Sequence, residues 1–191
     1  ITIIPGTNFE LYDKEKHNII SLGSCTTNAL VSMLKVVVDN FGVEVAGMTT
    51  VHAYTNTQVL LDVDATSNDL RRGRAAALNI VPTTTGAMAL IEKIIPELKN
   101  KISGCSLRVP VATVSLIDLT FTSKKDISAK IINDMFEKIS KDSKNSMYGI
   151  VDISYEQLVS SDYKLNSHSV IIDAPLTQVV SNRNARVFGW Y

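Results

Sequence analysis

The chain has 191 residues, 45% of them hydrophobic, which is enough to bury one sizeable core. Its 19 basic and 19 acidic residues cancel to a formal charge of zero, so we expect no nucleic-acid partner and no attraction to an anionic membrane. Two cysteines cannot form a disulfide framework, and no apolar run is long enough to span a bilayer. The composition therefore predicts a cytoplasmic protein in a reducing compartment.

Extended segments open the chain. Residues 1–4 and 18–23 are rich in isoleucine and lack helical periodicity, which predicts a short strand in each. The second segment leads into residues 24–28, which read Ser-Cys-Thr-Thr-Asn. Apolar side chains then recur at helical spacing, and Gly42 closes the predicted helix.

Cys25 falls in the first turn of this predicted helix, with Ser24, Thr26 or Thr27 as its N-cap. A thiol there faces unpaired backbone N–H groups and the positive end of the helix dipole, which both favour the thiolate. The position predicts a nucleophile. The alternative is that Cys25 is a small core residue, but its polar neighbours argue against simple burial.

His52 lies at the end of a predicted strand over residues 43–54, just before a polar loop. Sites are common at such positions, although a lone histidine is more often structural. His52 becomes a candidate only if it meets Cys25 in space. Residues 55–82 then form a long irregular stretch with an arginine-rich run at 71–74, which either forms a solvated edge or holds a phosphate.

A second helix is predicted after Thr85 and Gly86, whose hydroxyl and N–H groups either bind an oxyanion or form an ordinary cap. Strand-rich residues 106–122 follow, and Asp126 is predicted to cap a third helix. Later strands are predicted at 148–153, 169–173, 176–180 and 186–191.

Strands that follow one another without helical crossovers favour an α+β fold, with a mixed, partly antiparallel sheet and helices packed on one face. The sequence contains no glycine-rich phosphate loop and no zinc-ligand spacing, so no metal site is predicted.

Five segments resemble glyceraldehyde-3-phosphate dehydrogenase, in that family's order and at about its spacing. They are Ser24-Cys25-Thr26-Thr27-Asn28, His52-Ala53-Tyr54-Thr55, the run from Asp69 to Ala77, Thr85-Gly86-Ala87 and Arg108-Val109-Pro110. The resemblance covers essentially the whole chain but only the family's catalytic domain. It implies that residues 1–191 are a single catalytic domain of a longer dehydrogenase, with the N-terminal Rossmann domain and the C-terminal helix absent.

The resemblance implies phosphorylating oxidation of glyceraldehyde 3-phosphate to 1,3-bisphosphoglycerate through a thioester on Cys25. His52 would pair with the thiol and act as general base. The hydride would pass to NAD, or to NADP, which the absent domain would mostly hold. Inorganic phosphate would then release the acyl phosphate, and the backbone N–H of Cys25 would face the developing oxyanion.

Two anion sites are implied by the same resemblance. Thr55 and Arg72 match family positions around the substrate phosphate, although the adjacent Arg71 is an open alternative for that contact. Residues 55–78 resemble the family's S-shaped loop, which lies against a neighbouring subunit in a homotetramer. The positions around the attacking phosphate match Ser24, Thr26, Thr85, Gly86 and Arg108.

Three other functions stay open. Erythrose-4-phosphate dehydrogenase is the nearest, although the segments at 52–55 and 85–86 favour the triose enzyme. The chain alone can be a non-catalytic assembly domain, because without a cofactor domain we expect it to bind NAD poorly and to turn over little. A cysteine–histidine hydrolase is the remotest, since a peptide substrate needs no arginine and threonine anion sites.

Overall fold

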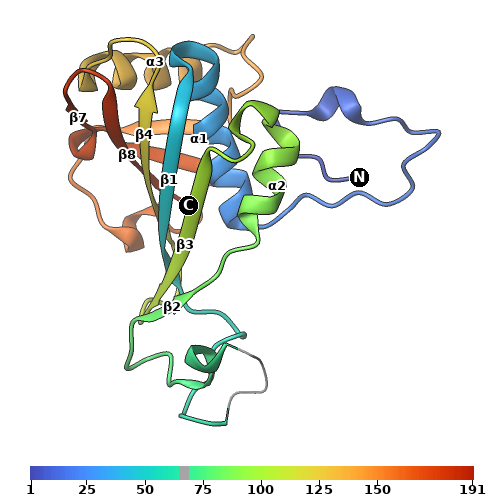
Figure 1. Ribbon diagram of the computed structural model, residues 1–191, viewed down its shortest axis with the longest axis vertical. Coiled ribbons are helices and arrows are strands. Elements are labelled where there is room, and N and C mark those ends of the chain that lie inside the picture. Colours follow the sequence, from blue (N-terminus) through green and yellow to red (C-terminus); the bar gives the residue numbers. More distant parts are fainter. Residues whose placement is uncertain (65–68) are drawn as a thin grey trace.

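A computed structural model of the chain describes residues 1–64 and 69–191 (Figure 1). Within this part, the helices are α1 (Cys25–Phe41), α2 (Ala87–Ile94) and α3 (Ala129–Lys141). The strands are β1 (Val43–Ala53), β2 (Val81–Thr83), β3 (Ile102–Val109), β4 (Leu116–Ser123), β5 (Val151–Ser154), β6 (Val170–Asp173), β7 (Gln178–Val180) and β8 (Asn184–Trp190).

The strands form one sheet in the order β2-β3-β1-β4-β8-β6-β5, with β7 also paired to β8. β1 pairs with β3 in parallel, and β5 pairs with β6 in parallel, whereas the other neighbours are antiparallel. The predicted α+β class and the mixed, partly antiparallel sheet are therefore confirmed.

The core lies between the helices and one face of the sheet. Leu119 of β4 and Val187 of β8 are fully buried against α1, whereas the alternating Asp118 and Arg186 pair on the opposite face. The described residues include no helix that is long and apolar enough to cross a membrane.

Helix α1 packs closely on the sheet because Gly189 of β8 has no side chain. A methyl group at Gly189 would lie only 2.5 Å from Val170 Cγ2 and 2.7 Å from Met33 Sδ of α1. Any larger residue would force the Val170 and Met33 side chains to shift. This approach matters because α1 begins at Cys25.

The two ends of α1 are set by local signals that the sequence predicts. The Ser24 side chain accepts a hydrogen bond from the Thr27 backbone N–H at 3.1 Å and caps the start. Gly42 ends the helix with φ of +67°, a conformation that favours glycine. Ser24 is thus the cap among the three candidates, the predicted end at Gly42 is confirmed, and Cys25 is the first helical residue.

The predicted strands at 1–4 and 18–23 are wrong. An isolated bridge between Thr2 and Ser21 and a hydrogen bond from the Ile1 amino group to the Ile19 carbonyl oxygen join these segments, and Ile19 is 83% exposed. The segments have no sheet neighbour to complete a ladder. Sheet pairing instead extends β3 back to Ile102, earlier than the strand start predicted at 106.

The predicted cap of the third helix is also wrong. Ser128, and not Asp126, precedes α3, and its Oγ accepts from the Ile131 backbone N–H at 3.2 Å. Asp126 lies two residues upstream in the turn after β4 and is exposed.

We predict that Ser128→Ala lowers the free energy of unfolding by about 1 kcal/mol, because the first turn of α3 loses its cap. Asp126→Ala serves as the matched control and should change it by less than about 0.5 kcal/mol. Urea unfolding followed by circular dichroism measures both. A larger loss for Asp126→Ala than for Ser128→Ala would contradict the cap assignment.

Candidate active site

Cys25 and His52 meet in space, which is the condition that the sequence left open. Cys25 is the first residue of α1, and His52 is the penultimate residue of β1. The Cys25 Sγ lies 3.7 Å from His52 Nε2. The thiol is exposed, whereas the imidazole is 7% exposed. The pair is thus open to a ligand from the cysteine side.

Parallel pairing of β1 with β3 places Arg108 beside His52. Arg108 Nη1 lies 2.7 Å from His52 Nδ1, and the Ala53 carbonyl oxygen lies 2.7 Å from the same nitrogen. Burial lowers the pKa of His52, the Arg108 charge lowers it further, and the Ala53 contact opposes the change. His52 is therefore neutral near pH 7, as a general base must be.

A cavity of about 410 Å³ opens beside this pair. Arg72 lines it and Arg71 does not, which separates the two adjacent arginines. Arg72 also donates from Nε to Asp69 at 3.3 Å. The nine site residues predicted from the sequence all line this cavity: Ser24, Cys25, Thr26, His52, Thr55, Arg72, Thr85, Gly86 and Arg108.

Arg108 carries a positive charge in this cavity without a carboxylate partner among the described lining residues. Its Nε is buried and makes no hydrogen bond. Burial lowers the pKa of Arg108, and the nearby Arg72 charge adds to this effect. A buried donor and two neighbouring guanidinium groups favour an anionic ligand.

Parts of the predicted loop at 55–78 are structural. Arg74 donates to the Asp62 carboxylate at 3.1 Å, and the same carboxylate accepts from the Ala75 N–H at 2.8 Å. Arg74 is thus an ion-pair residue on the surface. Positions 65–68 of this loop lie outside the described residues.

Tyr191 contacts the site, although the sequence placed it only at the end of a predicted strand over residues 186–191. Its hydroxyl lies 2.9 Å from Thr26 Oγ1 and 2.5 Å from Thr50 Oγ1. Its ring meets the His52 ring edge-on, with centroids 5.9 Å apart. The alternation of buried Ala185 and Val187 along β8 is a signal that places Tyr191 on the helix side.

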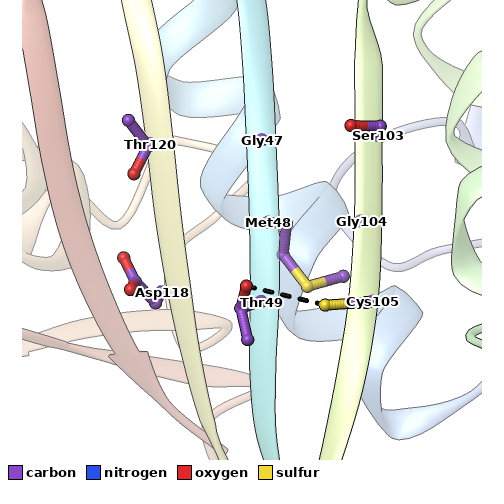
Figure 2. Close-up of a pocket in the computed structure, with 8 residues that line it drawn as sticks. All are labelled: Gly47, Met48, Thr49, Ser103, Gly104, Cys105, Asp118 and Thr120. Atoms are coloured by element: carbon purple, nitrogen blue, oxygen red, sulfur yellow. Dashed lines mark hydrogen bonds between the residues drawn. The ribbon is translucent and has the colours of Figure 1, made fainter. Parts of the chain in front are cut away.

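The second cysteine lies in a different environment. Cys105 is on the open face of the sheet, in a shallow hollow among Thr49, Asp118 and Thr120 (Figure 2). Its Sγ lies 3.8 Å from Thr49 Oγ1. Arg186 binds the Asp118 carboxylate from the neighbouring strand. No histidine lies among the described residues of this hollow, so Cys105 serves as an internal reference thiol.

The fold and the site together define an α+β domain with a cysteine–histidine pair beside a cavity of hydroxyl and guanidinium groups. Residues 24–191 match the family described as glyceraldehyde 3-phosphate dehydrogenase, C-terminal domain. The chain therefore belongs to this family.

Individual relatives agree with this assignment. Glyceraldehyde-3-phosphate dehydrogenase 2 of Bacillus subtilis (strain 168) is 47% identical over all 191 residues, which are 55% of that protein. Its namesake from Nostoc sp. (strain PCC 7120) is 46% identical over 190 residues, and glyceraldehyde-3-phosphate dehydrogenase of Borreliella burgdorferi is 44% identical over 191. The chain spans about half the length of these curated relatives.

We predict that iodoacetate alkylates Cys25 several-fold faster than Cys105 at neutral pH in phosphate buffer, because only Cys25 has an imidazole and a helix N-terminus beside it. Replacing the base by His52→Asn should slow the alkylation of Cys25 and leave the alkylation rate of Cys105 unchanged. Peptide mass spectrometry over a time course gives both rates. Equal rates in the unaltered chain would remove the activated nucleophile.

We also predict that the chain loses stability as the pH falls through the ordinary histidine range. The pKa of His52 is lowered in the folded state, so the unfolded chain takes up a proton near pH 6.5 that the folded chain resists. The contribution of neutral His52 to the free energy of unfolding is present above that pH and declines as the pH falls toward the lower pKa of the folded state.

The measurement is the urea midpoint between about pH 7.5 and 5.5 in the unaltered chain and in His52→Gln. The urea midpoint of His52→Gln should decline less with falling pH than that of the unaltered chain. His168→Gln, outside the cavity, controls for the loss of one imidazole. An equal decline in the unaltered chain and His52→Gln would contradict the prediction.

Proposed function

We propose that this chain is the catalytic domain of a phosphorylating dehydrogenase that oxidises glyceraldehyde 3-phosphate to 1,3-bisphosphoglycerate. The distance of 3.7 Å between Cys25 Sγ and His52 Nε2, at the wall of a cavity with two guanidinium groups, carries the proposal. Family membership supports it, since a relative named for this aldehyde is 47% identical over the whole chain.

In the proposed mechanism, His52 takes the proton from the Cys25 thiol. The Cys25 sulfur attacks the aldehyde carbon and forms a thiohemiacetal. The backbone N–H of Cys25 faces the developing oxyanion from the free end of α1. After oxidation to the thioester, an inorganic phosphate oxygen attacks the acyl carbon, the carbon–sulfur bond breaks, and Cys25 leaves as a thiolate.

Two groups of residues would receive the two phosphates. Arg72 and Thr55 line the cavity on one side and are proposed to hold the substrate phosphate. Ser24, Thr26, Thr85, Gly86 and Arg108 line the same cavity and are proposed to hold the attacking phosphate. Guanidinium and hydroxyl groups are the donors that phosphate oxygens prefer, which supports both assignments.

NAD, with NADP as the alternative, would supply the hydride acceptor when bound. Leu90 is the one large aliphatic residue among the described residues that line the cavity, so the lining fits a phosphate ester better than a dinucleotide. We therefore place the cofactor mostly on residues outside this chain, in a Rossmann domain of the full-length protein.

The full-length protein is proposed to be a cytoplasmic homotetramer. The sheet face opposite the helices and the described parts of the predicted loop, residues 55–64 and 69–78, are the surfaces proposed for a second copy. Erythrose-4-phosphate dehydrogenase remains the alternative in the same chemical class, and a non-catalytic assembly role remains the alternative for the chain by itself.

An acyl phosphate tests the half of the reaction that needs no cofactor. The 191-residue chain, incubated with acetyl phosphate, should become acetylated on Cys25: the thiolate attacks the acyl carbon, the carbon–oxygen bond breaks, and inorganic phosphate leaves. Intact-mass and peptide spectrometry should show this in Cys105→Ser but not in Cys25→Ser.

The same chain, given glyceraldehyde 3-phosphate, phosphate and NAD, should produce little NADH. Absence of acetylation on Cys25 would sink the proposed thioester chemistry. Strong NADH production by this chain would instead contradict the proposal that the cofactor is held outside it.

A further inference from the structure

His52 Nδ1 has two polar neighbours that cannot both use it. Arg108 Nη1 lies 2.7 Å from this nitrogen, and the Ala53 carbonyl oxygen also lies 2.7 Å from it. A guanidinium group only donates hydrogen bonds, and a carbonyl oxygen only accepts them. Arg108 therefore requires a bare Nδ1, whereas Ala53 requires a protonated one.

The protonation of Nδ1 determines whether Nε2 of neutral His52 can accept the proton of the Cys25 thiol. With Arg108 in contact, neutral His52 carries its proton on Nε2, which faces the sulfur and cannot accept the thiol proton. With Nδ1–H donating to Ala53, Nε2 has a free lone pair toward Cys25. The imidazolium that forms when His52 takes the thiol proton also needs Nδ1–H, so Arg108 opposes it.

An anion in the cavity would compete with His52 for the Arg108 guanidinium group. Its Nε is buried and unbonded, and its Nη1 also lies 3.1 Å from the Ala53 oxygen, the acceptor that Nδ1–H would use. An oxyanion accepts two parallel N–H bonds from a guanidinium group, which a ring nitrogen cannot do. Arg72 lines the same cavity and attracts the same anion.

We propose that Arg108 is a positioning residue that keeps His52 Nδ1 unprotonated in the empty cavity, and that an oxyanion draws Arg108 away and lets Nδ1–H bond to Ala53. The base thus becomes competent when phosphate is present. This proposal rests on the proposed anion site and adds a ligand-dependent control of its base.

The other ionisable groups around His52 do not compete for Nδ1. Cys25 faces Nε2 from α1, and Tyr191, which follows β8, meets the ring edge-on while its hydroxyl bonds Thr26 and Thr50. From β3, Arg108 is the cation in contact with the ring. The control is therefore attributable to one side chain.

Nitrogen-15 NMR of the histidine rings tests the proposal in the 191-residue chain. The chain has three histidines, and His52→Gln identifies the His52 signals. Near pH 7, the Nδ1 signal should have the position of an unprotonated nitrogen without anion. Titration with inorganic phosphate should move it to the position of a protonated nitrogen, and the pKa of His52 should rise.

Two variants separate the roles of the arginines. Arg108→Met removes the competing donor, so Nδ1 should be protonated without phosphate, and phosphate should cause no further change. Arg72→Met is the matched control: it should weaken phosphate binding but leave Nδ1 unprotonated in the empty cavity. If Arg108→Met fails to fold, the titration of the unaltered chain still decides.

Backbone amide signals of Thr85 and Gly86 report separately whether phosphate binds. Saturable amide shifts with an unchanged Nδ1 would overturn the control by Arg108 and leave the proposed anion site intact. No amide shift at any phosphate concentration would contradict the anion site, and the control with it. A protonated Nδ1 in the phosphate-free chain would also overturn the proposal.

Discussion

The contact between the first turn of α1 and the ends of β1 and β8 holds the candidate site together. Tyr191 makes this contact specific, because its hydroxyl bonds Thr26, next to Cys25, and Thr50, two residues before His52. One face of α1 is buried in the core along its length, so the helix cannot slide independently. The distance between sulfur and imidazole is therefore a property of the core and not of a flexible loop.

The same arrangement concentrates positive charge before any ligand arrives. The register of β1 and β3 places Arg108 beside His52, and its half-buried guanidinium has an unbonded donor. A charge in such a place is unfavourable without a partner. An anion that supplies the partner stabilises the folded domain and occupies the site in one step. Recognition of phosphate and stability of this corner of the domain are thus physically linked.

Local features were predictable and long-range ones were not. Ser24 and Gly42 act within a few residues, so the sequence predicts the end of α1 and limits its N-cap to Ser24, Thr26 or Thr27. The predicted strand at 18–23 was wrong, because a strand forms only where a partner strand pairs with it, and residue composition does not identify that partner. Asp126 and Ser128 are equally good caps by type, and only the path of the chain after β4 selects Ser128.

The cavity-lining residues were found because their motifs resemble a family. The competition at His52 Nδ1 could not be predicted, because it depends on the pairing of β1 with β3, which no local motif specifies.

The two cysteines show that position, and not residue type, determines the chemistry available to a thiol. Cys105 has threonine and a paired carboxylate around it, whereas Cys25 has a base and a free helix end. The described lining of the cavity around Cys25 contains no carboxylate and Arg72 pairs with Asp69 beside it, so a neutral peptide bond would leave the Arg108 charge uncompensated. A phosphorylated aldehyde supplies an electrophilic carbon for the sulfur and an anion for the arginines in one molecule. The electrostatics of the cavity therefore argue against a peptide hydrolase, independently of any sequence similarity.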